Sequence, residues 1–133
     1  MFIVPDINVI CKRVLQRHSK DIEELNKSQL SKGTKSDGSK LPAYKKSYLK
    51  TRRKYGRPTA PMDLNLTGQF YDKFFSQYFA TYLTLASKDG KEYILEQRFG
   101  SIHGLTDESI ESLLYDYGVL DEFVTEFIKE TFG

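Results

Sequence analysis

Residues 32–65 form a long polar segment that separates the two parts of the chain able to build a core. Its glycines and prolines are Gly33, Gly38, Pro42, Gly56, Pro58 and Pro61. Because these residue types end or turn regular structure, we predict an extended loop here, with a tight turn at Asp37-Gly38 and a short helix between Tyr44 and Lys54. A loop of this length inside a small domain is usually functional or becomes ordered on assembly.

The segment before this loop, residues 6–31, has the apolar spacing of an amphipathic helix. The apolar stripe consists of Ile7, Ile10, Cys11, Val14, Leu15, His18, Ile22, Leu25 and Leu30. We predict one long helix with Asp6 as its N-cap and Gly33 as its C-terminal stop. Since His18 falls on the apolar stripe, it is expected to be a partly buried structural histidine.

The octet from Asp63 to Phe70 joins the polar loop to the aromatic half of the chain. Thr67 is a candidate N-cap, and Gly68 allows a turn or a close backbone approach. A short aromatic helix is predicted over residues 67–76. Within this octet, the candidate folding and assembly motif is Leu66, Thr67, Gly68 and Phe70.

The remaining segments predict a β-hairpin followed by helices. Residues 78–87 alternate in side-chain type, residues 91–97 are rich in strand-forming side chains, and Ser87 to Lys91 has turn composition. Residues 106–132 carry a helical apolar stripe, with Thr106 as N-cap and a break at Gly118. We therefore predict one α+β domain over residues 1–133, in which the N-terminal helix and the C-terminal helices pack on a small antiparallel sheet.

Composition is that of a soluble chain of 133 residues, with 39% hydrophobic residues and a mean hydropathy of −0.50. No apolar run approaches the roughly 18 residues of a membrane helix. The N-terminus is too short and lacks the basic region expected of a signal peptide. Cys11 is the only cysteine, which favours a small core residue in a reducing compartment.

The net charge of +2 conceals a strong segregation of charge. Ten basic residues lie between Lys32 and Arg57, where Asp37 is the only acid. After residue 106 the acids are Asp107, Glu108, Glu111, Asp116, Asp121, Glu122, Glu126 and Glu130, against Lys129 alone. This pattern favours oriented assembly, in which the basic face of one copy meets the acidic face of the next, and it also allows contact with nucleic acid.

The residue patterns of common catalytic and metal sites are missing. No glycine-rich phosphate loop is present, and His18 and His103 are far apart with no cysteine or acidic cluster at metal spacing. Ser101-Ile102-His103 resembles a nucleophile–base pair only distantly, and it has no nucleophile elbow. Glu108, Glu111 and Asp116 suit a solvated face. We therefore predict no enzyme activity, no metal and no cofactor.

Residues 40–57 interleave aromatic and basic side chains, a combination that grips phosphates and stacks on bases. The candidate contact residues for a partner protein or DNA are Lys45, Lys46, Lys50, Arg52, Arg53, Lys54 and Arg57. The segment carries no known base-reading motif. A nucleic-acid-binding role and a protein-docking role therefore both remain open.

Several short motifs in this order resemble a known family. They are Leu30-Ser31-Lys32-Gly33, the turn from Ser36 to Pro42, Leu66-Thr67-Gly68-Gln69-Phe70, Arg98-Phe99-Gly100 and Gly104-Leu105-Thr106. Together they resemble the tailed-phage virion morphogenesis or tail-completion family, the small neck proteins that join head to tail. The resemblance covers roughly residues 20–130. The chain departs from the family pattern at Phe70, where an aliphatic residue is usual, and at Ser101-Ile102-His103, which separates Arg98-Phe99 from Gly104-Leu105.

This resemblance implies a structural, non-catalytic protein of the virion, assembled in the cytoplasm of the bacterial host. Its implied partners are other neck, portal or tail proteins and further copies of itself in a homo-oligomeric ring. Contact with packaged DNA through the basic loop is also implied, and no membrane is involved. The alternative is a small nucleic-acid-binding protein that uses residues 40–57.

Overall fold

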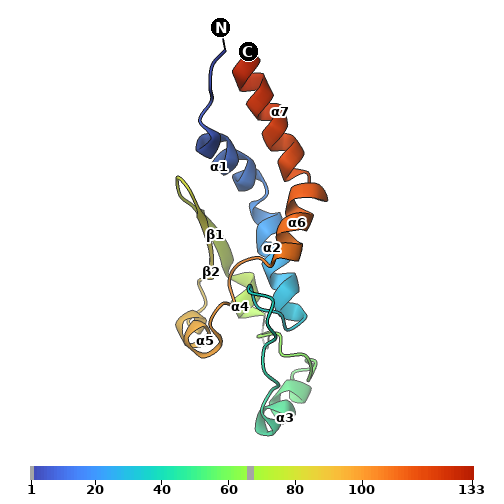
Figure 1. Ribbon diagram of the computed structural model, residues 1–133. Coiled ribbons are helices and arrows are strands. Elements are labelled where there is room, and N and C mark those ends of the chain that lie inside the picture. Colours follow the sequence, from blue (N-terminus) through green and yellow to red (C-terminus); the bar gives the residue numbers. More distant parts are fainter. Residues whose placement is uncertain (1, 66–67) are drawn as a thin grey trace.

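The computed structural model describes residues 2–65 and 68–133, which form an elongated mixture of helices and one small sheet (Figure 1). The N- and C-termini lie together at one end, and α3 lies at the other end. In chain order the elements are α1 Ile7–Arg17, α2 Ser19–Ser31, α3 Lys46–Lys54, α4 Gln69–Asp72, β1 Phe74–Tyr78, β2 Leu83–Ser87, α5 Glu92–Phe99, α6 Asp107–Tyr115 and α7 Val119–Phe132. The predicted α+β class is confirmed.

The prediction of one long N-terminal helix is wrong, because the chain bends at His18 between α1 and α2. The apolar spacing continues across the bend, so the sequence pattern does not reveal it. The two halves pack on different partners: α1 lies against α7, and α2 lies against α6. α6 and α7 are in turn separated at Gly118, as predicted. The α1–α7 pair therefore lies on one side of the breaks at His18 and Gly118, and the α2–α6 pair lies on the other.

The hairpin exists, but not where the sequence predicted it. β1 pairs antiparallel with β2 from Phe74 opposite Ser87 to Tyr78 opposite Leu83. Phe79 and Tyr82 close the connection, with the Phe79 N–H donating to the Tyr82 carbonyl at 2.8 Å and the rings stacked. The predicted second strand is the helix α5, because the turn after Ser87 continues into helix instead of reversing the chain. The predicted aromatic helix is correspondingly reduced to the four residues of α4.

Two clusters of buried side chains hold these elements together. The first lies between α1, α2, the hairpin and the C-terminal helices, and its buried members are Ile10, Val14, Ile22, Leu85, Leu113 and Val119. The second joins the end of α2 to the loop, α4, β1 and the segment after α5, and its buried members are Leu30, Leu41, Met62, Phe70, Phe74 and Ile102. Cys11 lies partly buried in α1.

Several local predictions are confirmed. The Asp6 carboxylate caps α1, and the Thr106 hydroxyl caps α6. The loop contains the predicted short helix, α3, and the Asp37 carboxylate accepts the Ser39 N–H in the turn at Gly38. Leu66 and Thr67 lie outside the described residues. No helix in the described part of the chain combines the length and apolar character needed to span a membrane.

Candidate interaction surface and a carboxylate–histidine cluster

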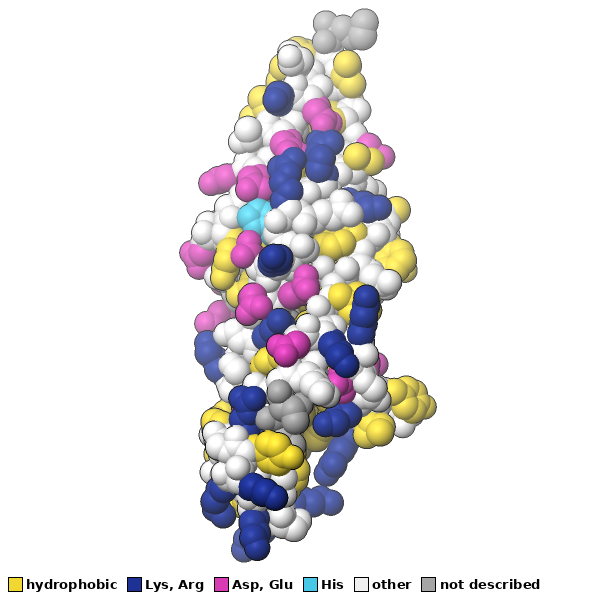
Figure 2. Space-filling model, turned by 180° about the vertical axis from the view of Figure 1, so that it is seen from behind, with side chains coloured by type: hydrophobic (Ala, Val, Ile, Leu, Met, Phe, Trp, Pro, Cys, Tyr) yellow, Lys and Arg dark blue, Asp and Glu magenta, His cyan; other side chains and the backbone are white. Residues whose placement is uncertain are grey.

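The basic arm, residues 45–57, projects at one end of the molecule and is built around α3. Its exposed cations are Lys45, Lys46, Lys50, Arg53 and Lys54. The sequence holds no acid between Asp37 and Asp63. Figure 2 accordingly shows Lys and Arg side chains at this end, while acidic side chains appear only farther along the molecule in that view. The arm therefore presents a positive surface.

Arg52 is not part of that surface, contrary to the sequence-based prediction. It is only 1% exposed, and its guanidinium donates to the Asp63 carboxylate at 2.9 Å, to the Pro58 carbonyl at 3.0 Å and to the Asn65 carbonyl. The guanidinium also lies over the Tyr44 ring, 4.5 Å from its centroid. α3 points this side chain inward, so Arg52 fastens the arm to the body.

Arg57, another predicted contact, is half-buried at the end of the arm. The backbone N–H of Arg57 donates to the Arg52 carbonyl at 2.9 Å, which forms a turn at the end of α3. The cations that remain available to a partner are therefore those on the outer face of α3 and at its start.

The Asp63 carboxylate holds the arm to the rest of the molecule through several hydrogen bonds. Its Oδ1 atom accepts from Arg52, from the Tyr44 hydroxyl at 3.0 Å and from the Asn65 N–H at 2.9 Å. Gly68 adopts φ +88°, a left-handed conformation just before α4, and Phe70 is buried in the second cluster. These two predicted motif residues therefore serve the fold.

A groove of about 630 Å³ lies between the start of the basic arm and α5. Apolar and aromatic side chains line it, among them Tyr48, Leu64, Leu95 and Phe99. Its basic lining residues, apart from the buried Arg52 that pairs with Asp63, are Lys35, Lys45, Lys91 and Arg98, and none of its described lining residues is acidic. The groove thus continues the positive character of the arm.

The C-terminal acids fall into two groups. Glu122, Glu126 and Glu130 pair with basic residues of α1 and with His18: Arg13 reaches Glu126 at 3.0 Å and Glu130 at 2.5 Å, and Arg17 also pairs with Glu126. The acidic patch is the other group, namely the exposed Asp107, Glu108, Glu111, Asp116 and Asp121, for which the described part of the chain shows no ion pair. Among the C-terminal acids, this patch is therefore the group that can meet a basic partner without breaking an ion pair of the described residues.

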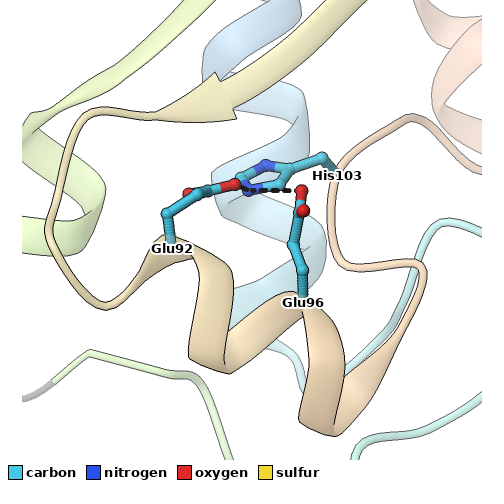
Figure 3. Close-up of side chains that lie close together, drawn as sticks. All are labelled: Glu92, Glu96 and His103. Atoms are coloured by element: carbon cyan, nitrogen blue, oxygen red, sulfur yellow. Dashed lines mark ion pairs between the residues drawn. The ribbon is translucent and has the colours of Figure 1, made fainter.

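Glu92 and Glu96 of α5 point toward His103 on the segment that follows the helix (Figure 3). Their ligand atoms all lie within 4.8 Å of one another. The His103 Nε2 atom is 2.5 Å from a Glu92 oxygen and 3.9 Å from a Glu96 oxygen. Burial and the neighbouring Glu96 carboxylate raise the pKa of Glu92 to about 7, and burial lowers the pKa of His103.

In the sequence, neither histidine has a cysteine or an acidic cluster at metal spacing, whereas the fold brings Glu92 and Glu96 to His103. The sequence signal for this cluster is the four-residue spacing of Glu92 and Glu96. It places the two carboxylates close together only if the segment is a helix. Four residues span about 6 Å along a helix but about 13 Å along a strand. Because residues 91–97 were assigned to a strand, the two carboxylates were not expected to meet at one point.

Comparisons with protein families, characterised proteins and solved structures find no match to this chain.

Proposed function

We propose that this chain is a structural protein of a tailed-phage virion, a component of the neck that joins head to tail. The observation that carries the proposal is the separation of the exposed cations of the basic arm, Lys45, Lys46, Lys50, Arg53 and Lys54, from an acidic patch on one small molecule. The order of the short motifs resembles that of tail-completion proteins, and this resemblance is the reason for placing the protein in a virion. The groove between the arm and α5 gives the arm a concave surface for a neighbour.

Complementary charge on different faces favours contact between the arm of one copy and the acidic patch of the next. Such a heterologous contact repeats from copy to copy, and it closes a ring when the rotation between copies closes. Exposed aromatic side chains accompany both charged surfaces: Tyr55 on the arm, and Tyr115 and Tyr117 beside the acidic patch. Charge then selects the partner face, while the aromatic side chains supply apolar contact area.

Charge reversal on each surface tests this contact. The arm variant carries Lys46→Glu and Lys50→Glu, and the patch variant carries Glu111→Lys and Asp116→Lys. None of these residues lies in an ion pair or in the two buried clusters. Mass is measured by light scattering at low and moderate salt. We expect a salt-sensitive oligomer for the wild-type chain and monomers for each variant.

The decisive sample is the chain that carries all four reversals, in which the two surfaces again have opposite charge. Its association should be restored. A matched control, Lys20→Glu with Lys73→Glu, changes two exposed lysines outside the arm and should associate as the wild-type chain does. A wild-type chain that stays monomeric at high concentration and low salt would overturn the self-assembly contact.

Nucleic-acid binding by the arm is the second candidate, favoured by the run of exposed cations beside Tyr48 and Tyr55. Duplex DNA is the probe. Tight binding at moderate salt, with a steep salt dependence that the arm variant reduces, would promote this function over the neck role. Weak binding that does not depend on the arm would leave assembly as the supported function.

A further inference from the structure

We propose that Glu92, Glu96 and His103 bind a divalent transition-metal ion, with Zn²⁺ as the best match. Two carboxylate oxygens and one imidazole nitrogen converge from α5 and the segment after it (Figure 3). This donor set is typical of zinc and related ions, whereas Mg²⁺ and Ca²⁺ prefer oxygen ligands alone. The proposal is independent of the neck function.

A buried histidine that faces a buried carboxylate is the second observation. The His103 side chain is 6% exposed; its Nε2 atom faces the Glu92 carboxylate at 2.5 Å without hydrogen-bond geometry, and its Nδ1 atom makes no hydrogen bond. The Glu92 Oε1 atom beside it is also buried without a hydrogen-bond partner. Buried polar groups without partners are uncommon because each costs free energy. A bound cation between Glu92 Oε1 and the facing Nε2 atom would replace their close 2.5 Å contact with two coordination bonds.

The surrounding residues orient the two buried ligands, Glu92 and His103. The other carboxylate oxygen of Glu92 accepts the Ser87 N–H at 2.9 Å, which leaves Oε1 directed at His103. The imidazole lies against two aromatic rings, with centroids 5.8 Å from Phe70 and 5.1 Å from Phe74. Groups that orient a ligand in this way are characteristic of protein metal sites.

Only small movements are needed for coordination. Two ligand atoms at about 2.1 Å from a tetrahedral zinc lie about 3.4 Å apart. The Glu92 oxygen would therefore move away from Nε2, from 2.5 Å, and the Glu96 oxygen would move closer, from 3.9 Å. Glu96 has a half-exposed side chain, so it can rotate and admit the ion from solvent.

The consequence would be structural. None of the residues of α5 is fully buried, and the partly buried Leu95 and Phe99 pack this helix against the second cluster. A metal ion shared by Glu92, Glu96 and His103 would fasten α5 to the segment after it. Because Lys91, Leu95 and Arg98 line the groove, the ion would also fix the wall opposite the basic arm.

The test is zinc binding by the full chain after treatment with a chelator, followed by calorimetry and by thermal unfolding. We expect one bound Zn²⁺ and a higher melting temperature. Co²⁺ as a second probe should give visible absorption bands of a low-symmetry site. Glu96→Gln, a change at an exposed carboxylate, should weaken Zn²⁺ binding at least about tenfold, and His103→Gln should do the same.

His18→Gln is the matched control, because His18 also lies between two carboxylates, Asp21 and Glu122. These carboxylates occupy opposite ring nitrogens, so they do not converge on one ion, and this variant should bind Zn²⁺ as the wild-type chain does. Absence of binding by Zn²⁺ and Co²⁺, or unchanged affinity in Glu96→Gln, would overturn the proposal. The Glu96→Gln result decides even if His103→Gln fails to fold.

Discussion

The Nε2 atom of His18 lies 3.0 Å from the Oε2 atom of Glu122, linking the bend between α1 and α2 to the first turn of α7. The opposite ring nitrogen of His18 lies 3.0 Å from the Asp21 carboxylate. The largely buried imidazole of His18 therefore connects the bend between α1 and α2 to the start of α7.

Stability at this joint should depend on pH through His18. Burial lowers the pKa of His18, but hydrogen bonds with Asp21 and Glu122 outweigh that effect and raise the pKa above its ordinary value. A raised pKa in the folded state means that protonated His18 stabilises the fold. This contribution is complete below the unfolded pKa of about 6.5 and is lost as pH rises through the higher folded value.

The measurement is urea unfolding of the wild-type chain and His18→Gln between pH 6 and 9. We expect the difference in stability between them to shrink as pH rises. Arg17, 3.8 Å from Glu122, stays charged throughout and contributes equally to both. A difference that is constant over this range would show that His18 acts only through packing.

The buried pair of Arg52 and Asp63 should be costly to break. Asp63→Ala would leave a guanidinium buried without its anion and would remove the acceptor of the Tyr44 hydroxyl. We expect a loss of about 3–5 kcal/mol in the free energy of unfolding, measured in urea. Arg52→Met combined with Asp63→Ala should lose less than the sum of the single changes, and Lys54→Met, on the exposed face of α3, should cost less than about 0.5 kcal/mol.

Two amides of α2 hold the segment that carries His103, and Asn26 is the more deeply buried. Its side chain donates to the Ile102 carbonyl at 3.0 Å and accepts the Gly104 N–H at 3.2 Å. Asn26→Ala should cost about 2–3 kcal/mol, because it leaves both backbone groups without partners. Urea unfolding measures the loss, and faster hydrogen exchange at Gly104 would locate it; unchanged exchange there would contradict this role.

Two glycines with similar backbone angles should respond differently to alanine. Gly33 has φ +72° and Gly118 has φ +78°, so alanine is strained at both. A Cβ at Gly33 would lie 2.9 Å from the Pro61 Cβ and 3.2 Å from the Met62 carbonyl oxygen, whereas a Cβ at Gly118 meets nothing within 4 Å. Gly118→Ala should cost about 1–2 kcal/mol from backbone strain alone.

Gly33→Ala should cost clearly more than Gly118→Ala, since the contact with Pro61 adds to the strain. Thermal unfolding of the two variants compares them directly. Equal losses would mean that the Pro61 segment moves aside freely, and hence that it is loosely held against the end of α2.

Local sequence signals predicted the features that depend on neighbouring residues. The caps at Asp6 and Thr106, the turn at Gly38 and the break at Gly118 each require only a side chain or a glycine acting within a few residues. The segregation of charge between residues 32–57 and the C-terminal helices was likewise evident without a structure, although the role of Arg52 was not. Its burial depends on Asp63, eleven residues away in sequence, which is beyond the reach of a helical pattern.

The tertiary structure decided whatever depends on distant partners. The bend at His18 follows from packing against two differently directed helices, and an apolar stripe is compatible with either a bent or a straight helix. Residues 91–97 have side chains suited to a strand or a helix, and the hydrogen bond from the Ser87 N–H to Glu92 accompanies their helical form here. The cluster of Glu92, Glu96 and His103 depended on that outcome, because only the pitch of a helix brings both carboxylates within reach of one imidazole.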